Sequence, residues 1–445
     1  MKNLKIYGAL KRFSKFKQIT FSMPGHKRDK RFSPIFKTRR FDVTELTALE
    51  IEKACAMAEA DVSAIYGARL TRFLSGGSTL GVLSMLNSVR HLGNKIIINR
   101  SAHKSVYNAC KILNIEPITI SGVVRSGVLY APTFSAVQKA IDENENVIGV
   151  LLTYPDYYGK TFDLKKISAF LKEKDKKFLI DGAHGAHLKF FGGVNPLDYA
   201  DLCVFGAHKT LPTLTGGAFV LAKGVDLAEK LNESVNLFAS TSPSYPILSS
   251  IEYGVKKFNG LSDRVKEKYT DLLSQLKVKI AKIGYTFIHK TDPLKLSIDF
   301  GGNGINSDTA EKVLISRGIH AEMNDGRYLL FMFSPFTSKG QFNKLYRACY
   351  YLYKKKRGQV ENKNYSTQLH GEKVTEYLTA INGDVEMVSL SNSIGRVSAD
   401  NIGVFPPCYP VVIAGERITE DNVKLLKGNV FGILDGKVKV LKEKL

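Results

Sequence analysis

The 445-residue chain has no apolar run close to the roughly 20 residues that a membrane-spanning helix needs, so the sequence predicts a soluble protein. Its basic first segment, Met1 to Lys17, lacks the continuous apolar core and cleavage site of a secretory signal, and we expect the cytoplasm. Hydrophobic residues make up 44% and charged residues 24%. These values are near globular averages, which excludes collagen-like, low-complexity and wholly disordered classes.

Cysteine is scarce. The five cysteines are scattered, odd in number and never spaced as Cys-x-x-Cys, which argues against a disulfide framework and against a zinc site. We therefore predict no metal and expect ordinary buried thiols at Cys55, Cys110, Cys203, Cys349 and Cys408.

Acidic residues are outnumbered: 42 Asp and Glu stand against 64 Lys and Arg, giving a net charge of +22. Such a charge attracts anions and nucleic acid without specificity. The basic residues are spread along the chain, with local runs only at Lys11 to Lys30 and Lys354 to Arg357, and no recognisable nucleic-acid module contains them. We expect a solvated basic surface and neither a specific nucleic-acid partner nor a membrane partner; nucleic-acid binding stays as the alternative.

Helical patterns alternate with short apolar runs from about Val43 to Phe219, and helices are expected at Thr79–Leu92 and Ser135–Ile141. Nearly continuous apolar strands between helices predict an α/β domain with a parallel sheet covered on both faces. The predicted strands are Lys95–Asn99, Glu116–Ile120, Val147–Thr153, Phe178–Ile180, Leu202–Phe205 and Ala218–Leu221.

The rest of the chain predicts smaller units. A long helical stretch, Ile247 to Ile283, leads into an α+β pattern at Lys295–Phe300, Thr309–Arg317 and Tyr328–Phe333, and the polar segment Lys354 to Gln368 is typical of a linker. No internal repeat is present. The predicted domains are an N-terminal arm (1–42), a large domain (43–246), a small α+β domain (247–355), a linker (356–369) and a small C-terminal domain (370–445).

Four clusters stand next to predicted strands, where open parallel sheets bind ligands. Ser75 to Thr79 precedes a helix, so its glycines, hydroxyls and helix terminus suit a phosphate group; an ordinary helix cap is the alternative. Arg100 to Ser105 places His103 after a strand, where an imidazole can lie on a ring or act as acid or base. A purely structural histidine is the other interpretation.

The other two clusters contain a carboxylate and an amine. Asp181 begins the run to His187, and its carboxylate can pair with a protonated ring nitrogen, while the small residues leave room for a flat cofactor. Metal binding by this aspartate and the histidines is the alternative. Lys209 follows the next strand, where partial desolvation would favour an amine nucleophile over an ordinary solvated lysine. We expect Asp181 and Lys209 in one cleft.

Together these clusters describe a pyridoxal phosphate site, in which the cofactor is the electron sink. The order of motifs closely resembles the bacterial Orn/Lys/Arg decarboxylases, a fold-type-I family dependent on pyridoxal phosphate. The resemblance is carried by Phe21–Lys27, Phe41–Leu46, Ser101–Ser105, Asp181–His187, His208–Pro212, Thr241–Pro246 and Gly395–Asp400, with Pro406-Pro407 and Gly415-Glu416.

The resemblance implies an aspartate-aminotransferase-like large domain and decarboxylation of lysine, arginine or ornithine to the amine, in polyamine or diamine production. Lys209 would hold pyridoxal 5'-phosphate as a Schiff base, Asp181 would keep its ring nitrogen protonated, and His103 would stack on the ring. His208 would align the substrate or protonate the product carbon. Lys209, His208, Asp181 and His103 are thus the expected catalytic residues.

Other residues would complete the cofactor site by the same resemblance. Ala183 would pack on the second ring face, Ser78 and Thr79 would bind the phosphate, and Ser240 or Thr241 would reach the neighbouring subunit's phosphate. A homodimer or higher homo-oligomer follows. Decameric assembly is not expected, because the chain resembles the shorter branch without an N-terminal wing domain. The expected cofactor-binding set is Lys209, Asp181, Ala183, His184, His103, Gly77, Ser78, Thr79, Ser240 and Thr241.

The chain also departs from the family pattern. Gly206 replaces a hydroxyl residue three positions before the lysine, Ala207 replaces a threonine, and Gly216-Gly217 replaces a glutamine. Near the C-terminus, Cys408 and Ala414 stand for a glycine and a proline. These departures leave open that the protein acts on a divergent substrate or is inactive. A different reaction with the same cofactor on the same fold, transamination or β-elimination, is the other alternative.

The substrate's basic side chain would need a carboxylate at the far end of the pocket. Glu416 is a candidate for that carboxylate, and a surface charge in a turn is its alternative.

Overall fold

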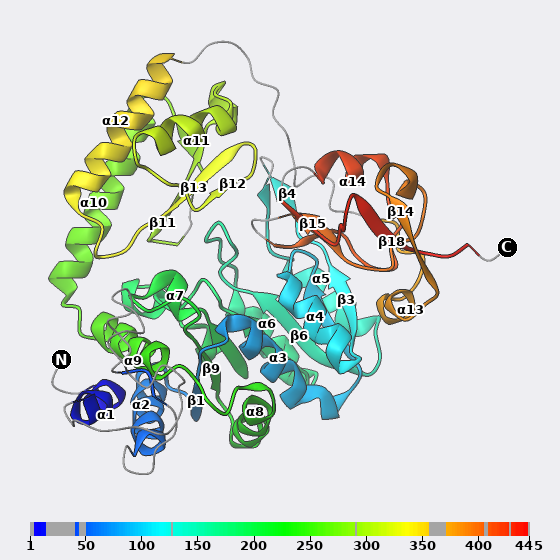
Figure 1. Ribbon diagram of the computed structural model, residues 1–445, viewed down its shortest axis with the longest axis horizontal. Helices are drawn as coiled ribbons and strands as arrows, with labels where there is room; N and C mark the ends of the chain where they lie inside the picture. The colour runs from blue at the N-terminus through cyan, green and yellow to red at the C-terminus, as the bar shows by residue number, and fades with distance from the viewer. Residues whose placement is uncertain are drawn as a thin grey trace, which may run out of the picture. The chain divides into compact units, whose positions relative to one another are not determined.

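The computed structural model describes residues 4–14, 41–43, 50–125, 128–289, 292–355, 371–404, 408–426 and 429–443 (Figure 1). The chain forms two compact units: Met1–Gly93 with Ser168–Leu261, and Asn94–Ile167 with Ser262–Leu445. Among the described helices, none is long and apolar enough to cross a membrane.

The first unit contains strands in the order β1 (Leu70–Leu74), β9 (Ala218–Ala222), β8 (Leu202–Phe205) and β7 (Lys177–Asp181). β7 and β8 are parallel, whereas β9 runs antiparallel to both β8 and β1. The described residues of this unit contain the helices α1 (Lys5–Ser14), α2 (Ile51–Tyr66), α3 (Gly77–Val89), η3 (Arg90–Leu92), η4 (Leu188–Phe191), η5 (Pro196–Asp198), α7 (Ala207–Thr210), α8 (Val225–Phe238) and α9 (Tyr245–Asn259). Helix α6 (Leu164–Glu173) contains the boundary between the units.

Side chains in the core of the first unit hold strands β8 and β9 and the turn that follows β7 in place. Every residue of β8 and β9 is buried, as expected for strands with helices on their faces. Gly81 lets α3 approach β8 closely, because an added Cβ would lie 2.4 Å from Val204 Cγ2. The Tyr66 ring packs against Phe205, and its hydroxyl donates a 2.6 Å hydrogen bond to the Ala186 carbonyl. The buried tyrosine thus supports the turn that follows β7.

The second unit contains the parallel strands β6 (Val147–Thr153), β2 (Lys95–Asn99) and β3 (Glu116–Ile120), in that order. Asn99 Oδ1 accepts a 3.0 Å hydrogen bond from the Thr153 backbone N–H, which ties the carboxyl ends of β2 and β6 together. The associated elements are α4 (Lys104–Leu113), α5 (Phe134–Asp142) and the hairpin β4 (Val124–Arg125) and β5 (Val128–Leu129).

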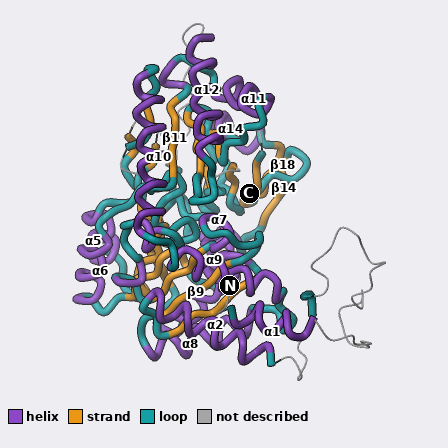
Figure 2. The backbone as a smooth tube through the Cα atoms, turned by 90° about the vertical axis from the view of Figure 1, so that its left-hand side faces the viewer, coloured by secondary structure: helices purple, strands orange, loops and turns teal. Residues whose placement is uncertain are grey.

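An antiparallel sheet in the second unit has the order β10 (Thr286–Phe287), β11 (Lys295–Asp299), β13 (Tyr328–Met332) and β12 (Met323–Asn324). Its helices are α10 (Asp263–Lys282), η6 (Gly301–Asn303), α11 (Ser307–Ser316) and α12 (Lys339–Lys355). Helices α10 and α12 lie side by side (Figures 1 and 2), where the Tyr269 and Phe342 rings meet edge to face at 5.7 Å.

The C-terminal part, from Gly371 on, has an antiparallel pair of strands, β14 (Val385–Ser389) and β18 (Lys437–Leu441). It also has a three-stranded sheet in the order β16 (Pro410–Val412), β15 (Ile402–Val404) and β17 (Val430–Phe431). Its helices are α13 (Tyr377–Ile381), η8 (Ser391–Ser393) and α14 (Glu420–Leu425). Ile402, Val412, Ile418, Val438 and Val440 form a small core of their own.

Most predicted strands agree with the structure, but not every element does. The helical stretch expected from Ile247 to Ile283 is two helices, since Gly260 ends α9 and Ser262 begins α10. The edge strand β1 was not predicted, because Thr71 and Arg72 interrupt its apolar pattern. Lys354 and Lys355, placed in the linker segment, belong to α12, and the domain boundaries stay predictions.

Some motifs of the resemblance lie outside the described residues. These are Phe21–Lys27, the part of Phe41–Leu46 from residue 44 on, and Pro406-Pro407.

Candidate active site

The parallel pair β7 and β8 brings Asp181 and Lys209 to the same edge of the first unit. Asp181 is the last residue of β7 and is in register with Val204 of β8. The Gly182 N–H donates to the Val204 carbonyl at 2.9 Å, so the turn after β7 begins beside the end of β8. The turns that carry Asp181 and Lys209 are therefore neighbours, and a shared cleft for the two residues stays a prediction.

Lys209 lies on the short helix α7 and points toward the turn that follows Asp181. Its Nζ is 3.2 Å from His184 Nε2. Asp181 is 3% exposed, and its Oδ1 accepts a 3.1 Å hydrogen bond from the Ala183 N–H. A primary amine, an imidazole and a buried carboxylate thus occur together on two neighbouring turns.

Gly206 brings these two turns into close approach. An added Cβ at this position would lie 2.7 Å from the Ala183 carbonyl oxygen and 3.3 Å from Lys209 Cδ. A backbone atom cannot move aside as a flexible side chain can. A side chain at position 206 is therefore disfavoured by this packing.

The loop Gly216-Gly217 joins the lysine turn to the start of α3. Gly217 O accepts from the His208 N–H at 3.1 Å and lies 2.9 Å from His208 Nδ1. Since a carbonyl only accepts, the proton of the neutral imidazole is on Nδ1. Gly216 O accepts a 2.8 Å hydrogen bond from the Gly77 N–H. Gly216 has φ +89, a backbone conformation that a side chain disfavours.

The expected phosphate cradle is the amino end of α3. The Gly77 N–H is directed to Gly216, so the groups that this turn can offer an anion are those of Ser78 and Thr79 in the first helical turn. Gly77 has φ +70, a left-handed backbone conformation that glycine adopts more readily than other residues.

The remaining predicted cofactor residues lie elsewhere. Ser240 and Thr241 are exposed, and Ser240 Oγ accepts from the Ser242 N–H at 3.1 Å. His103 belongs to the second unit and caps α4, because its Nδ1 accepts from the Ser105 N–H at 3.2 Å. That bond leaves the neutral ring's proton on Nε2. The roles expected for these three residues stay predictions.

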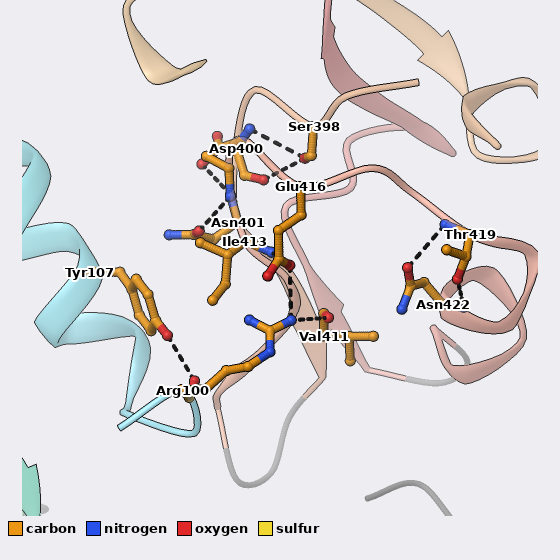
Figure 3. A network of polar contacts seen from close by, with 11 residues as sticks. Arg100, Tyr107, Ser398, Asp400, Asn401, Val411, Ile413, Glu416, Thr419 and Asn422 are labelled. Carbon is orange, nitrogen blue, oxygen red and sulfur yellow. Dashed lines mark hydrogen bonds and ion pairs between the residues drawn. The ribbon is translucent and has the colours of Figure 1, made fainter. Parts of the chain in front are cut away.

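Glu416 is buried, and a surface charge in a turn is the wrong interpretation. The residue is 7% exposed, and its Oε2 accepts from Arg100 at 2.9 Å and from the Ile413 N–H at 2.8 Å (Figure 3). The sequence analysis did not select Arg100 as a functional residue. The feature of the sequence that could have identified Arg100 is its position, directly after an apolar strand and three residues before His103.

The structure also bears on the metal and thiol expectations. Among the described residues, no group of three or more His, Cys, Asp or Glu side chains could hold a metal ion. All five cysteines are free thiols; Cys110, Cys203 and Cys349 are buried, and Cys55 and Cys408 are half-buried. Burial raises the pKa of the Cys349 thiol to about 12, which makes it an inert thiol.

Lysine decarboxylase A from Pseudomonas aeruginosa superposes with a TM-score of 0.82 at 16% identity, covering 98% of this chain and 80% of that one. This likeness shows the fold, which is that of the fold-type-I enzymes, an α/β class with a mostly parallel sheet and smaller additional sheets.

The family model of the Orn/Lys/Arg decarboxylase major domain matches residues 5–288, and that of the family's C-terminal domain matches residues 360–427. The chain belongs to the Orn/Lys/Arg decarboxylase family. It is 28% identical to "Uncharacterized protein YaaO" of Bacillus subtilis, covering 95% of this chain and 94% of that protein. It is 26% identical to the arginine decarboxylase of the same organism, covering 96% and 93%.

The expected family and fold class are confirmed, and the chain is an amino-acid decarboxylase of this family. Enzymes of the family act on basic amino acids with pyridoxal phosphate. The expected reaction, decarboxylation of a basic amino acid, and its expected dependence on pyridoxal phosphate both agree with membership of this family.

Proposed function

We propose that this chain decarboxylates a basic amino acid with pyridoxal 5'-phosphate bound in the first unit at Lys209. The observation that carries the proposal is the position of the Lys209 amine, 3.2 Å from His184 Nε2 on the turn that follows the buried Asp181. Pyridoxal phosphate needs a lysine amine for its carbonyl carbon and a carboxylate for its ring nitrogen, and this pair of turns carries one of each.

The residues fit the cofactor by the chemistry of their donors. Lys209 supplies an amine for the carbonyl carbon of pyridoxal, and Asp181 supplies a carboxylate largely removed from water. Ser78 and Thr79 supply donors at a helix terminus for the phosphate. When bound, the cofactor ring accepts the electron pair released as the carboxylate leaves.

The protein's own residues then position the reactants and move a proton. Ala183 presents a small side chain next to the lysine turn, and His103 is the residue that we assign, by the family resemblance, to contact with the cofactor ring. His208 holds its Nδ1 proton toward Gly217, so Nε2 is the ring nitrogen that can contact the substrate. We assign His208 to substrate alignment in this neutral form, where Nε2 is an acceptor, or to protonation of the product carbon from its imidazolium form, in which Nε2 also carries a proton.

Arginine is the substrate we propose, and the Bacillus subtilis relative named arginine decarboxylase supports it. We further propose a cytoplasmic homodimer in which Ser240 or Thr241 reaches the neighbouring subunit's phosphate. The exposed position of both residues is compatible with contact to a partner.

Amine and carbon dioxide release tests the proposal. Purified protein with added pyridoxal phosphate is given arginine, lysine and ornithine separately, and we expect one substrate, arginine, to be turned over. Lys209→Ala should lower kcat by at least about 1,000-fold, as loss of a covalent catalytic group does. Lys165→Ala, an exposed lysine of α6, is the matched control and should leave kcat unchanged.

Three results contradict parts of this proposal. Unchanged turnover in Lys209→Ala removes Lys209 from the chemistry. Turnover of lysine or ornithine in preference to arginine overturns the substrate assignment. A keto acid or ammonia as product identifies transamination or elimination instead.

A further inference from the structure

Helix α12 of the second unit has an exposed stripe of basic and aromatic residues. The helix contains no Asp or Glu. Its apolar residues recur every three or four positions and are buried, so they hold one side of the helix against the protein: Phe342, Leu345, Ala348, Cys349 and Leu352. The opposite side faces solvent. Its exposed residues, named the α12 stripe below, are Lys344, Arg347, Tyr350, Tyr351 and Lys354.

A hollow of about 350 Å³ lies beside the α12 stripe, where the end of α11 meets α12. Its lining residues are Arg317, Ile319, Gly340, Lys344, Arg347 and Ala348. Three of them are cations, and none is acidic. Within the part of the chain that the structure describes, Arg317, Lys344 and Arg347 form no ion pair. A hollow lined by charges of one sign concentrates ligands of the opposite sign, so this one favours an anion.

The cations of the hollow come from two elements and meet at one turn. The central carbon of the Arg317 guanidinium lies 4.0 Å from the centre of the Tyr351 ring, a cation–π contact that holds the guanidinium in place. Lys344 Nζ reaches the same turn, since it is 3.3 Å from the position of a Cβ added to Gly318. The positive charge of the hollow is therefore not that of a single helix face.

The tyrosines of the stripe present aromatic surface beside these charges. Tyr350 is 44% and Tyr351 39% exposed. Lys354 Nζ lies 5.7 Å from the centre of the Tyr350 ring. Exposed rings next to a basic groove are the combination that binds single strands, because bases stack on the rings while cations contact the backbone. A duplex keeps its bases stacked inside, and an acidic peptide has no bases, so the tyrosines favour a single strand over both.

We propose that the α12 stripe and its hollow bind single-stranded nucleic acid without sequence specificity, with phosphates at the three cations and bases on the exposed tyrosines. All of these residues belong to the second unit. The net charge of +22 adds long-range attraction for any polyanion. This activity is separate from decarboxylation and needs no cofactor, so its test is independent of the proposed function.

The first test removes the three cations of the hollow. The probe is a fluorescein-labelled strand of about ten thymidine nucleotides, longer than the roughly 15 Å of the stripe, and binding is followed by fluorescence anisotropy. The triple variant Arg317→Gln/Lys344→Gln/Arg347→Gln should weaken binding about tenfold or more at low salt. The slope of log affinity against log salt concentration should become shallower by about 2, because three phosphate contacts are lost.

The matched control removes the same charge elsewhere. The triple variant Lys111→Gln/Lys165→Gln/Lys172→Gln replaces three exposed lysines outside α11 and α12. It should change the affinity by less than about twofold, because salt screens charges that do not contact the strand. All six substituted residues are exposed, so both variants are expected to fold, and thermal melting followed by circular dichroism checks this.

The second test removes one stacking surface and leaves every charge in place. Tyr350→Leu keeps an apolar side chain and should weaken binding of the single strand by about fivefold or more, as loss of one base–aromatic contact does. The same variant should bind a duplex of equal length as the wild type does. The wild type should bind the single strand more tightly than the duplex.

Equal losses in the two triple variants would overturn the proposal, since the attraction would then come from net charge alone. Unchanged single-strand binding in Tyr350→Leu, or equal wild-type affinity for single strand and duplex, would overturn it as well. Polyglutamate that competes as strongly as unlabelled oligonucleotide would identify a general polyanion surface instead. Absence of binding by the wild type at low salt would leave the stripe an ordinary solvated surface.

Discussion

At the scale of single residues, the space around Gly206 shows how closely the turn of Ala183 and the turn of Lys209 approach each other. An added Cβ would lie 2.7 Å from the Ala183 carbonyl oxygen, so a side chain at this position must displace backbone. We predict that Gly206→Ser lowers the free energy of unfolding by about 1–3 kcal/mol, the usual cost of overpacking. It should also weaken pyridoxal phosphate binding, because the displaced turn carries Asp181 and Ala183.

Urea unfolding and cofactor titration measure both effects, with Gly224→Ser as the control. Gly224 precedes α8, and nothing lies within 4 Å of its added Cβ. Serine there should change stability by only a few tenths of a kcal/mol. Tighter cofactor binding in Gly206→Ser would contradict the account, since it would mean that a hydroxyl is accommodated after all.

At this scale the sequence predicts the position of residues that follow an apolar strand, and it misses features that depend on contacts between residues far apart in the chain. Asp181 and Lys209 could be predicted because a polar residue after an apolar strand is visible in the sequence. The burial of Glu416 could not be predicted, because its partner Arg100 is more than 300 positions away in the chain. The crowding at position 206 depends on a carbonyl of another turn.

At the scale of elements, Glu59 connects α2 to β1 and makes their contact sensitive to pH. Its Oε1 accepts from the Phe73 N–H at 2.7 Å, and Arg72 Nε is 3.5 Å away. Burial raises the pKa of Glu59 to about 7, although Arg72 and the Phe73 hydrogen bond oppose the rise. The folded state therefore binds this proton more tightly than the unfolded state, so the group's contribution to stability falls as pH rises from about 4.5 to 7.

We predict that Glu59→Gln flattens this pH dependence, because glutamine keeps an acceptor for the Phe73 N–H and has no charge to bury. The loss of unfolding free energy between about pH 5 and pH 8 should be about 2 kcal/mol smaller in Glu59→Gln than in the wild type. Denaturant unfolding at both pH values provides the measurement. Glu52→Gln, an exposed position of the same helix, is the control. Parallel pH curves for Glu59→Gln and wild type would show that the carboxylate is ionised in the folded protein throughout.

Element boundaries were predictable where apolar runs are unbroken and failed where one residue changes the chain direction. The bounds of β2, β3, β6 and β8 agree with the sequence analysis. The break between α9 and α10 depends on Gly260 and Ser262, which interrupt an otherwise continuous helical pattern.

At the scale of the whole molecule, the proposed homodimer predicts complementation between two inactive variants. Lys209→Ala keeps Ser240 and Thr241, and a Ser240→Ala/Thr241→Ala double variant keeps Lys209. If one subunit completes the other's phosphate site, a hybrid dimer has one intact site. Random mixing after reversible dissociation should restore about one quarter of wild-type activity, as two-fold symmetry requires.

Size-exclusion chromatography with light scattering confirms that the mixed sample is dimeric, and remixing each variant with itself is the control. Activity that remains at the level of the unmixed variants, in a sample with demonstrated subunit exchange, would show that each subunit holds its phosphate alone.

The most direct test of the central claim is covalent trapping of the cofactor on the protein. Purified protein is incubated with pyridoxal phosphate, reduced with borohydride so that a Schiff base becomes a stable amine, and digested for mass spectrometry. The account predicts one major modified peptide, with the added mass on Lys209, and loss of that modification when the amino-acid substrate is present before reduction. Stoichiometric modification of a different lysine, with Lys209 unmodified, would contradict it.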